Sequence, residues 1–279
     1  MSERRGTTLE SVASHALLVV AVIFAVYPLL WVIATALSPG GIAEVGALPL
    51  PRKPSLENFA QVVGTGWLFA RQLANSLVVS LATAAVAIVV ATPAAYALAR
   101  FRFVGAKAGV RLLLATQMFP TVASAVPLYL MLEALHLLDS QAGLVLVYAT
   151  TAVPFAIFQL RGAFEAIPVD LEEAAMVDGA TRAQAFLKVA LPAARPAIAV
   201  TALFAFMSAW NEFILAATLL SRKTAYTLPV VLQGYVSEHR TEWGPFAAGA
   251  ILVSVPVMIL FYVAQRQLVA GLTAGGVKG

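Results

Sequence analysis

The feature that most constrains this chain is a set of six strongly apolar, almost uncharged segments. The hydrocarbon core of a bilayer is about 30 Å thick, so a helix rising about 1.5 Å per residue needs about 20 apolar residues to cross it. Segments of that length lie at about 14–37, 73–99, 112–132, 141–160, 197–220 and 246–265. We therefore expect an all-α polytopic membrane protein with six transmembrane helices, organised as one domain over residues 1–279.

The composition excludes an ordinary soluble domain. Of the 279 residues, 61% are hydrophobic and 11% are charged, whereas soluble domains are about half apolar and about a quarter charged. The chain contains no cysteine, which excludes disulfides and thiol chemistry. Its three histidines, His15, His136 and His239, do not have metal-ligand spacing. We therefore expect neither catalytic residues nor a metal site.

The distribution of basic residues predicts the orientation of the chain in the membrane. If the N-terminus is cytoplasmic, twelve of the 18 Lys and Arg residues fall in inner segments and six in outer ones, with the densest cluster at 100–111. Such an excess marks the cytoplasmic side. Both termini and the polar segment 165–195 are then expected in the cytoplasm. The first apolar segment follows Arg4 and Arg5 but is too long for a signal peptide, so we expect it to be retained.

Segment 165–195 has the pattern of two short helices joined at a glycine. Asp170 and Glu173 form one candidate capping box, and Thr181 with Gln184 forms a second. Gly179 accepts the left-handed conformation that ends a helix. The residue before a proline resists helical geometry, so Leu191-Pro192 is expected to end the second helix.

The spacing within this segment resembles a family signature. Glu-Ala-Ala, three residues, Gly, nine residues, a branched apolar residue, one residue and Leu-Pro is the EAA motif of membrane subunits of binding-protein-dependent ABC importers. This chain has Val189 where isoleucine is usual, and its matching residues are Glu173, Ala174, Ala175, Gly179, Leu191 and Pro192. The resemblance implies the type I importer permease fold and a segment that docks on an ATP-hydrolysing subunit, with Asp178 and Phe186 in the same surface. The alternative is a solvated amphipathic loop.

A broader resemblance covers nearly the whole chain. Pro120, Pro127-Leu-Tyr, Trp210-Asn-Glu-Phe213 and the tail Gly271–Gly279 are similar to carbohydrate permeases of the maltose and trehalose type, in particular their six-span G-type subunit. This resemblance implies ATP-driven sugar import by alternating access in a bacterial or archaeal cytoplasmic (inner) membrane. It also implies that the tail reaches between the ATP-binding subunits.

The resemblance further implies a set of partners. They are a homologous second permease subunit, a dimer of ATP-binding subunits, an extracytoplasmic sugar-binding protein and membrane lipid, but no nucleic acid. No Gly-rich loop ending in Gly-Lys-Ser/Thr occurs in the sequence. ATP and Mg²⁺ are therefore expected on the partner ATPase subunits, and no cofactor is expected on this chain.

Four residues in the apolar segments are candidates for the translocation pathway or the permease interface: Pro120, Pro127, Asn211 and Glu212. A carboxylate within a span, such as Glu212, is costly and commonly functional; the alternative is an interfacial acid paired with water or another helix. The two prolines, seven residues apart, are expected on one face, freeing the carbonyls of Thr116 and Ala123. Those carbonyls would face sugar or water, or the prolines would produce a packing kink.

The main alternative function is an ion-coupled secondary transporter. Such a protein is expected to carry several ionisable residues within its spans and inverted repeats with broken helices. This sequence has one intramembrane acid and no visible repeat. An intramembrane hydrolase would need a metal motif or a nucleophile and base, which the sequence does not suggest.

Overall fold

The computed structural model describes residues 8–41, 49–51, 53–64, 66–236 and 241–276, and they group into two compact units. Unit 1 comprises Met1–Phe69 with Leu232–Ser254, and unit 2 comprises Ala70–Val231 with Val255–Gly279. Each unit is described by itself. The single domain expected from the sequence stays a prediction.

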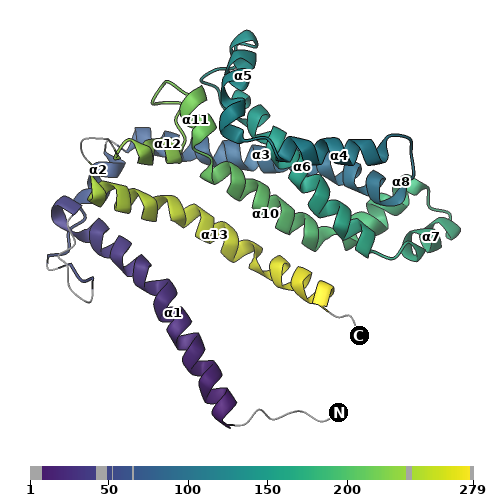
Figure 1. Ribbon diagram of the computed structural model, residues 1–279, viewed down its shortest axis with the longest axis horizontal. Helices are drawn as coiled ribbons and strands as arrows, with labels where there is room; N and C mark the ends of the chain where they lie inside the picture. Colours follow the sequence, from purple (N-terminus) through teal and green to yellow (C-terminus); the bar gives the residue numbers. More distant parts are fainter. Residues whose placement is uncertain (1–7, 42–48, 52, 65, 237–240, 277–279) are drawn as a thin grey trace. The chain divides into compact units, whose positions relative to one another are not determined.

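The described residues are mostly helical (Figure 1). In chain order the elements are α1 (Thr8–Leu37), the 3₁₀ turn η1 (Pro39–Gly41), α2 (Glu57–Val63), α3 (Trp67–Arg100), α4 (Ala106–Gln117), α5 (Thr121–Ala134), α6 (Gln141–Ala166), α7 (Asp170–Val177), α8 (Arg182–Ala185), the π-helical turn η2 (Phe186–Ala190), α9 (Leu191–Ala193), α10 (Arg195–Asn211), α11 (Ile214–Leu219), α12 (Leu228–Gln233) and α13 (Trp243–Gly276).

Within the described residues, four helices are individually long and apolar enough to cross a membrane, and they confirm four of the expected spans. They are Glu10–Leu37 in α1, Trp67–Arg100 in α3, Gln141–Ala166 in α6 and Trp243–Gln265 in α13. The count reaches six if each of two bent helix pairs is one span. The cytoplasmic location of both termini stays a prediction, and Arg4, Arg5 and residues 277–279 of the predicted tail lie outside the described residues.

The prediction of one continuous helix over 112–132 is wrong. The chain forms α4 and α5 there, bent by 100° at a break between Gln117 and Thr121. Pro120 disfavours helical geometry in the residue before it and itself adopts an extended conformation at the start of α5. The carbonyl of Thr116 accepts a hydrogen bond from the Phe119 N–H (3.4 Å), so Pro120 does not free it.

The prediction of one helix over 197–220 is also wrong. Helix α10 ends at Asn211, Glu212 is extended (φ −70°, ψ 125°), and α11 begins at Ile214. At its other end, α10 is bent by 71° from the helix that precedes it, Arg182–Ala193. The 17 residues of α10 rise only about 26 Å, somewhat less than the thickness of the hydrocarbon core.

The centre of unit 2 is helix α6, which lies side by side with α10 (Figure 1) and also contacts α4 and α11. Leu144, Val147 and Leu160, which lie on different sides of α6, are all almost fully buried. Leu132 of α5 and Leu219 of α11 complete the buried cluster around its first half. This packing holds the two broken helix pairs against a continuous one.

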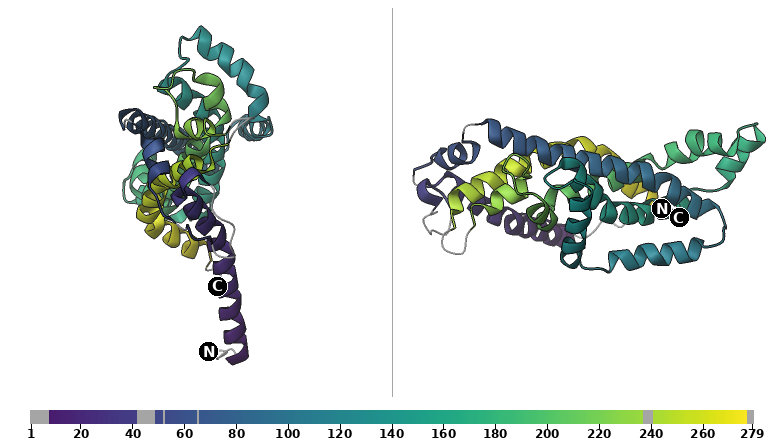
Figure 2. Two further views of the ribbon diagram at one scale, coloured as in Figure 1. Left: turned by 90° about the vertical axis from the view of Figure 1, so that its left-hand side faces the viewer. Right: turned by 90° about the horizontal axis from the view of Figure 1, so that it is seen from above.

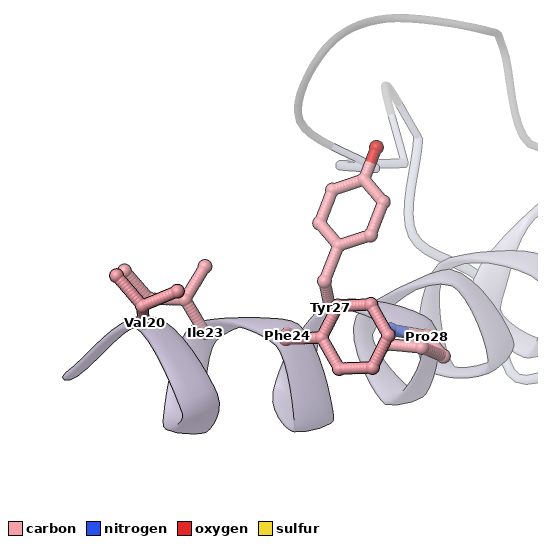
Figure 3. A pocket seen from close by; sticks show the side chains of 5 residues that line it. All are labelled: Val20, Ile23, Phe24, Tyr27 and Pro28. Atoms are coloured by element: carbon pink, nitrogen blue, oxygen red, sulfur yellow. The ribbon is translucent and has the colours of Figure 1, made fainter. Parts of the chain in front are cut away.

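Helix α1 presents apolar side chains to its surroundings over nearly its whole length. A shallow hollow of about 360 Å³ on this helix is lined by Val20, Ile23, Phe24, Tyr27 and Pro28. Figure 3 shows these five side chains. Such a surface is costly in water but not against lipid tails, which are as apolar as leucine. The exposure of α1 therefore agrees with its assignment as a span.

A buried amide organises unit 1. Asn58 of α2 is 3% exposed, and its Nδ2 donates to the carbonyls of Ala36 and Ser38 at 2.9 Å each. Gly244, at the start of α13, approaches this side chain so closely that a Cβ there would lie 2.4 Å from Asn58 Oδ1. The close approach permits α13 to pack Ala247 and Ala248 against Ala36.

We predict that Gly244→Ala lowers the thermal stability of the detergent-solubilised protein, although alanine is normally the better helix former by about 1 kcal/mol. The added methyl group displaces Asn58 from its two carbonyl partners, and each lost hydrogen bond costs about 1 kcal/mol. Gly162→Ala in α6 is the matched control, because a Cβ there meets nothing within 4 Å. It should leave the melting temperature unchanged or raise it; equal effects of the two substitutions would contradict the packing described.

A charged clamp in unit 2 joins the α5–α6 loop to the segment after α11. Asp139 Oδ1 accepts hydrogen bonds from the backbone N–H groups of Ser221 (2.6 Å) and Arg222 (3.0 Å), and Arg222 Nη2 donates to the Asp139 carbonyl (3.0 Å). Partial burial raises the pKa of Asp139, but these bonds and the Arg222 charge outweigh it and hold the pKa below its usual value of 3.8.

This clamp predicts a pH dependence. A carboxylate with a lowered pKa stabilises the folded state at pH above its unfolded pKa, and that contribution is lost as the pH falls through the folded pKa. We expect Asp139→Asn to melt at a lower temperature than the unmodified chain at pH 7. The difference should shrink as thermal melts are repeated from pH 5 downward, and a difference that grows instead would refute the assignment.

Candidate functional site

The segment α7 to α9 projects at one end of unit 2 (Figure 2). The glycine corner predicted from the sequence is present: Gly179 has φ +92°. Its N–H bonds the carbonyl of Met176 (3.1 Å), and the Ala180 N–H bonds that of Ala175 (3.0 Å). This pair of bonds is the Schellman motif, which ends α7 and satisfies two of its last carbonyls.

The second predicted capping box is confirmed, and the first is wrong. Thr181 Oγ1 accepts the Gln184 N–H (3.3 Å), and Gln184 Oε1 accepts the Thr181 N–H (2.8 Å). Helix α7, in contrast, starts after Val169 with no side-chain cap. Asp170 lies inside its first turn, where it and Glu173 place negative charge near the free N–H groups.

The prediction that Leu191-Pro192 ends the second helix is also wrong. The helix continues through Pro192 to Ala193, and the bend follows at Ala194. The turn before the proline is π-helical, with the Leu191 N–H bonded to the carbonyl of Phe186 five residues earlier. A proline ring ordinarily collides with the carbonyl four residues before it, and the wider π turn gives it room.

A buried ion pair that the sequence analysis did not identify fixes α7 to the end of α3. Glu172 Oε1 lies 2.7 Å from Arg100 Nε, and the two side chains are 5% and 8% exposed. Glu172 Oε2 accepts a hydrogen bond from the Tyr96 hydroxyl (2.5 Å). Arg100 Nη2 also donates to the carbonyl of Ile167, just before α7 (2.8 Å). Glu172, Arg100 and Tyr96 are called the anchor cluster below.

Aromatic rings complete the attachment. The ring of Tyr96 lies 4.5 Å from that of Phe186 and 5.5 Å from that of Phe164, measured between centroids. Phe164 is fully buried and Phe186 half-buried. Phe186, which the family resemblance assigned to the docking surface, therefore packs inward and joins η2 to α3 and α6.

The opposite side of α7 is open. Glu173, Ala174 and Asp178 are exposed, whereas Ala175 is half-buried. Val177 is 87% exposed, an unusual position for a branched apolar side chain at a helix end. The remaining residues of the signature, Val189, Leu191 and Pro192, are half-buried. The surface thus combines a carboxylate, small residues and an uncovered apolar side chain, which suits contact with another protein.

The four pathway candidates differ in burial and in their contacts. Pro120, Pro127 and Asn211 are exposed, and the Asn211 amide donates to the Met207 carbonyl of its own helix (2.9 Å). Glu212 is half-buried and caps α11: its Oε1 accepts the Leu215 N–H (2.9 Å) and its Oε2 the Ala216 N–H (3.1 Å). Within the described residues, no three His, Asp or Glu side chains gather as metal ligands would.

Comparison with known proteins gives concordant results. A family model described as "Binding-protein-dependent transport system inner membrane component" matches residues 87–273. The chain is 38% identical to the trehalose transport system permease protein SugB of Mycobacterium tuberculosis over 258 residues, covering 92% of this chain and 93% of that one. It is 36% identical to the maltose/maltodextrin transport system permease protein MalG of Yersinia pestis over 302 residues, covering 100% and 97%.

Among solved structures, the chain is similar to one from a bacterial ABC transporter involved in the import of the acidic polysaccharide alginate. The TM-score is 0.76 at 26% sequence identity, and the match covers 95% of this chain and 99% of that one.

The anchor cluster predicts different effects for two adjacent glutamates. Glu172→Gln leaves Arg100 buried and uncompensated, which typically costs about 3–5 kcal/mol. We expect a lower melting temperature and faster proteolysis within 165–195. Glu173→Gln is the matched control, because exposed substitutions usually change stability by no more than about 0.5 kcal/mol. Equal stability of the two variants would show that the ion pair does not hold α7.

Proposed function

We propose that this chain, which belongs to the family of binding-protein-dependent transport system inner membrane components, forms one half of the translocation pathway of an ATP-driven sugar importer. Family membership rests on the match over residues 87–273 and on relatives covering more than nine-tenths of the chain. Sugar as the substrate class is supported by the trehalose and maltose/maltodextrin permeases among those relatives. The ion-coupled secondary transporter is the less supported alternative.

The observation that carries the proposal is the two-sided character of α7. One side is fixed to α3 by the anchor cluster, and the other side exposes Glu173, Ala174 and Val177. A helix that merely connects two spans needs neither a buried ion pair on one side nor a bare apolar residue on the other. Both features suit a segment on which an ATPase subunit docks and exerts force.

The anchor cluster transmits this force from α7 to α3. Arg100 is the last residue of α3, a helix of 34 residues long enough to cross the membrane. A displacement of α7 is therefore applied directly to the end of a span. Shifting an equilibrium between two states from 1:99 to 99:1 needs about 5.5 kcal/mol of differential interaction. In this proposal, closure of the ATPase dimer supplies that energy.

The proposed assembly contains this chain, a homologous second permease subunit, a dimer of ATP-binding subunits and an extracytoplasmic sugar-binding protein. ATP and Mg²⁺ bind to the ATPase subunits, and this chain catalyses no reaction. The segment 165–195 and both termini lie in the cytoplasm, on the side that the excess of basic residues indicates.

The test is uptake of radiolabelled trehalose and maltose into proteoliposomes that contain the assembled complex. We expect Glu173→Ala to weaken ATPase docking tenfold or more. In this proposal Glu173 pairs with a basic residue of the ATPase subunit. Losing one member of a buried interfacial charge pair costs about 2–5 kcal/mol, and about 1.4 kcal/mol corresponds to a factor of ten. ATP-dependent uptake should fall accordingly, while membrane insertion persists.

Glu133→Ala is the control, because Glu133 is also an exposed acid on a helix but lies on α5, outside the docking segment. It should leave uptake unchanged. Uptake driven by an ion gradient in vesicles that contain this chain alone would refute the proposal and favour a secondary transporter.

A further inference from the structure

The stretch that follows α3 is basic and has no acid to balance it. Arg102, Lys107 and Arg111 are exposed, and none of them forms an ion pair within the described part of the chain. The sequence contains no Asp or Glu over residues 58–132. The nearby Arg100, in contrast, is buried in the anchor cluster. Residues 102–111, called the basic segment below, therefore present three cations without a local counter-charge.

Exposed apolar side chains lie among these cations. Phe103 is half exposed and Val104 fully exposed in the loop between α3 and α4. The start of this loop is fixed, because the Phe101 ring packs edge-on against Tyr96 and the Arg182 guanidinium lies over it at 5.8 Å. Exposed phenylalanine and valine are unfavourable in water. Their combination with lysine and arginine is typical of segments that lie at a membrane surface.

Helix α4 presents different residues on its two sides. Val110 and Leu113 are half-buried, and Gln117 Nε2 donates to a main-chain carbonyl of α6 (3.0 Å), so this side of α4 packs on α6. Lys107 and Arg111 lie one turn apart and away from that side. Both cations are therefore available to a partner outside unit 2.

The exposed residues of α4 also change in character along its length. Beyond Lys107 and Arg111, the exposed side chains are Leu112, Leu114 and Met118. Helices α4 and α5 together form a candidate membrane span. The two cations are about 6 Å apart along the helix axis, and the headgroup layer on each side of the hydrocarbon core is about 5–7 Å thick. The cations thus suit the headgroup level, and the apolar residues after them suit the lipid tails.

An acidic surface lies on the same side of the membrane. The anchor cluster fixes α7 to the end of α3, directly before the loop 101–105. The docking segment exposes Asp170, Glu173 and Asp178. A protein surface that receives these carboxylates is complementary to them when it is basic, and a basic surface repels the basic segment. The basic segment therefore requires a different, anionic partner.

We propose that the basic segment binds the headgroup of an anionic phospholipid, with Phe103 and Val104 inserted beside its acyl chains. Arginine pairs with phosphate oxygens through two N–H groups and lysine through its point charge, so Arg102, Lys107 and Arg111 suit a lipid phosphate. The inference rests on the proposed function for the cytoplasmic location of this segment. The cytoplasmic leaflet is the one whose negative surface attracts basic segments next to a span.

The absence of cysteine from the sequence permits a direct test. Val104→Cys places an environment-sensitive dye in the basic segment, and Val177→Cys on α7 is the matched control, because the two valines are 103% and 87% exposed. The labelled full-length chain is placed in nanodiscs of phosphatidylglycerol and phosphatidylcholine. We expect nitroxide-labelled lipid to quench the dye at position 104 and aqueous acrylamide to leave it unquenched. The reverse is expected at position 177.

A second measurement tests the role of charge. Native mass spectrometry gives the ratio of phosphatidylglycerol to phosphatidylcholine retained by the chain from nanodiscs with equal amounts of both. Each Lys or Arg near an anionic surface contributes about fivefold. We therefore expect the triple variant Arg102→Gln, Lys107→Gln and Arg111→Gln to lower this ratio tenfold or more. Its melting temperature in detergent without anionic lipid should be unchanged, because these side chains have no ion-pair partner within the described residues.

The control for the triple variant is Lys188→Gln with Arg195→Gln. Both residues are exposed cations of unit 2 that lie outside the basic segment. The double variant should leave the retention ratio unchanged. A loss as large as that of the triple variant would show general charge attraction rather than a site and would overturn the inference.

The remaining outcomes separate this inference from the proposed function. Position 104 that stays accessible to acrylamide in phosphatidylglycerol nanodiscs would overturn the inference, and protection that appears only after addition of ATPase subunits would assign the segment to protein contact instead. Equal retention of the two lipids by the unmodified chain would also overturn it. Neither measurement requires transport, so absent ATP-driven uptake with position 104 protected would overturn the proposed function and leave the lipid site standing.

Discussion

The contact between Arg100 and Glu172 is the interaction on which the site depends. Two charges buried at 8% and 5% exposure are unfavourable unless each finds a partner, and a buried ion pair by itself rarely adds much stability. The pair instead fixes the position of α7. With the Tyr96 hydroxyl and the Ile167 carbonyl, it leaves one placement for α7 relative to α3. Because Glu172 is buried against α3, the residues on the far side of α7, such as Glu173 and Ala174, are exposed.

Interruptions of regular structure recur along unit 2. Helices break between Gln117 and Thr121 and again at Glu212, and a π turn precedes Pro192. In hydrocarbon, a free N–H or C=O group costs several kcal/mol, about what one buried unsatisfied amide costs. The break at Glu212 is tolerated because its backbone groups have partners. The Glu212 carboxylate accepts hydrogen bonds from N–H groups in the first turn of α11, and a cavity beside it is polar. An uninterrupted bundle would have no such cavity.

Prediction from the sequence succeeded where local chemistry decides the outcome. Gly179 is left-handed because only glycine adopts that conformation freely, and Thr181 with Gln184 forms its box because both partners lie within one turn. It failed where a distant residue intervened. Asp170 had the spacing of a cap, yet α7 starts after Val169 with no side-chain cap, and Glu172 in its first turn bonds Arg100, 72 residues away. Two adjacent glutamates look alike in sequence, and only packing separates the buried one from the exposed one.

The sequence by itself determined that the chain is a helical membrane protein, which follows from the length and apolar character of six segments. It also determined the corner at Gly179 and, through the spacing of its motif, the family. Tertiary structure alone decided which segments break, because a break within a span is tolerated only where other groups satisfy the freed backbone, as Glu212 does for two N–H groups of α11. It alone decided that Tyr148, Thr83 and Glu212 share one cavity. These residues come from two helices, α3 and α6, and one helix break, and no local pattern encodes contacts between positions so far apart.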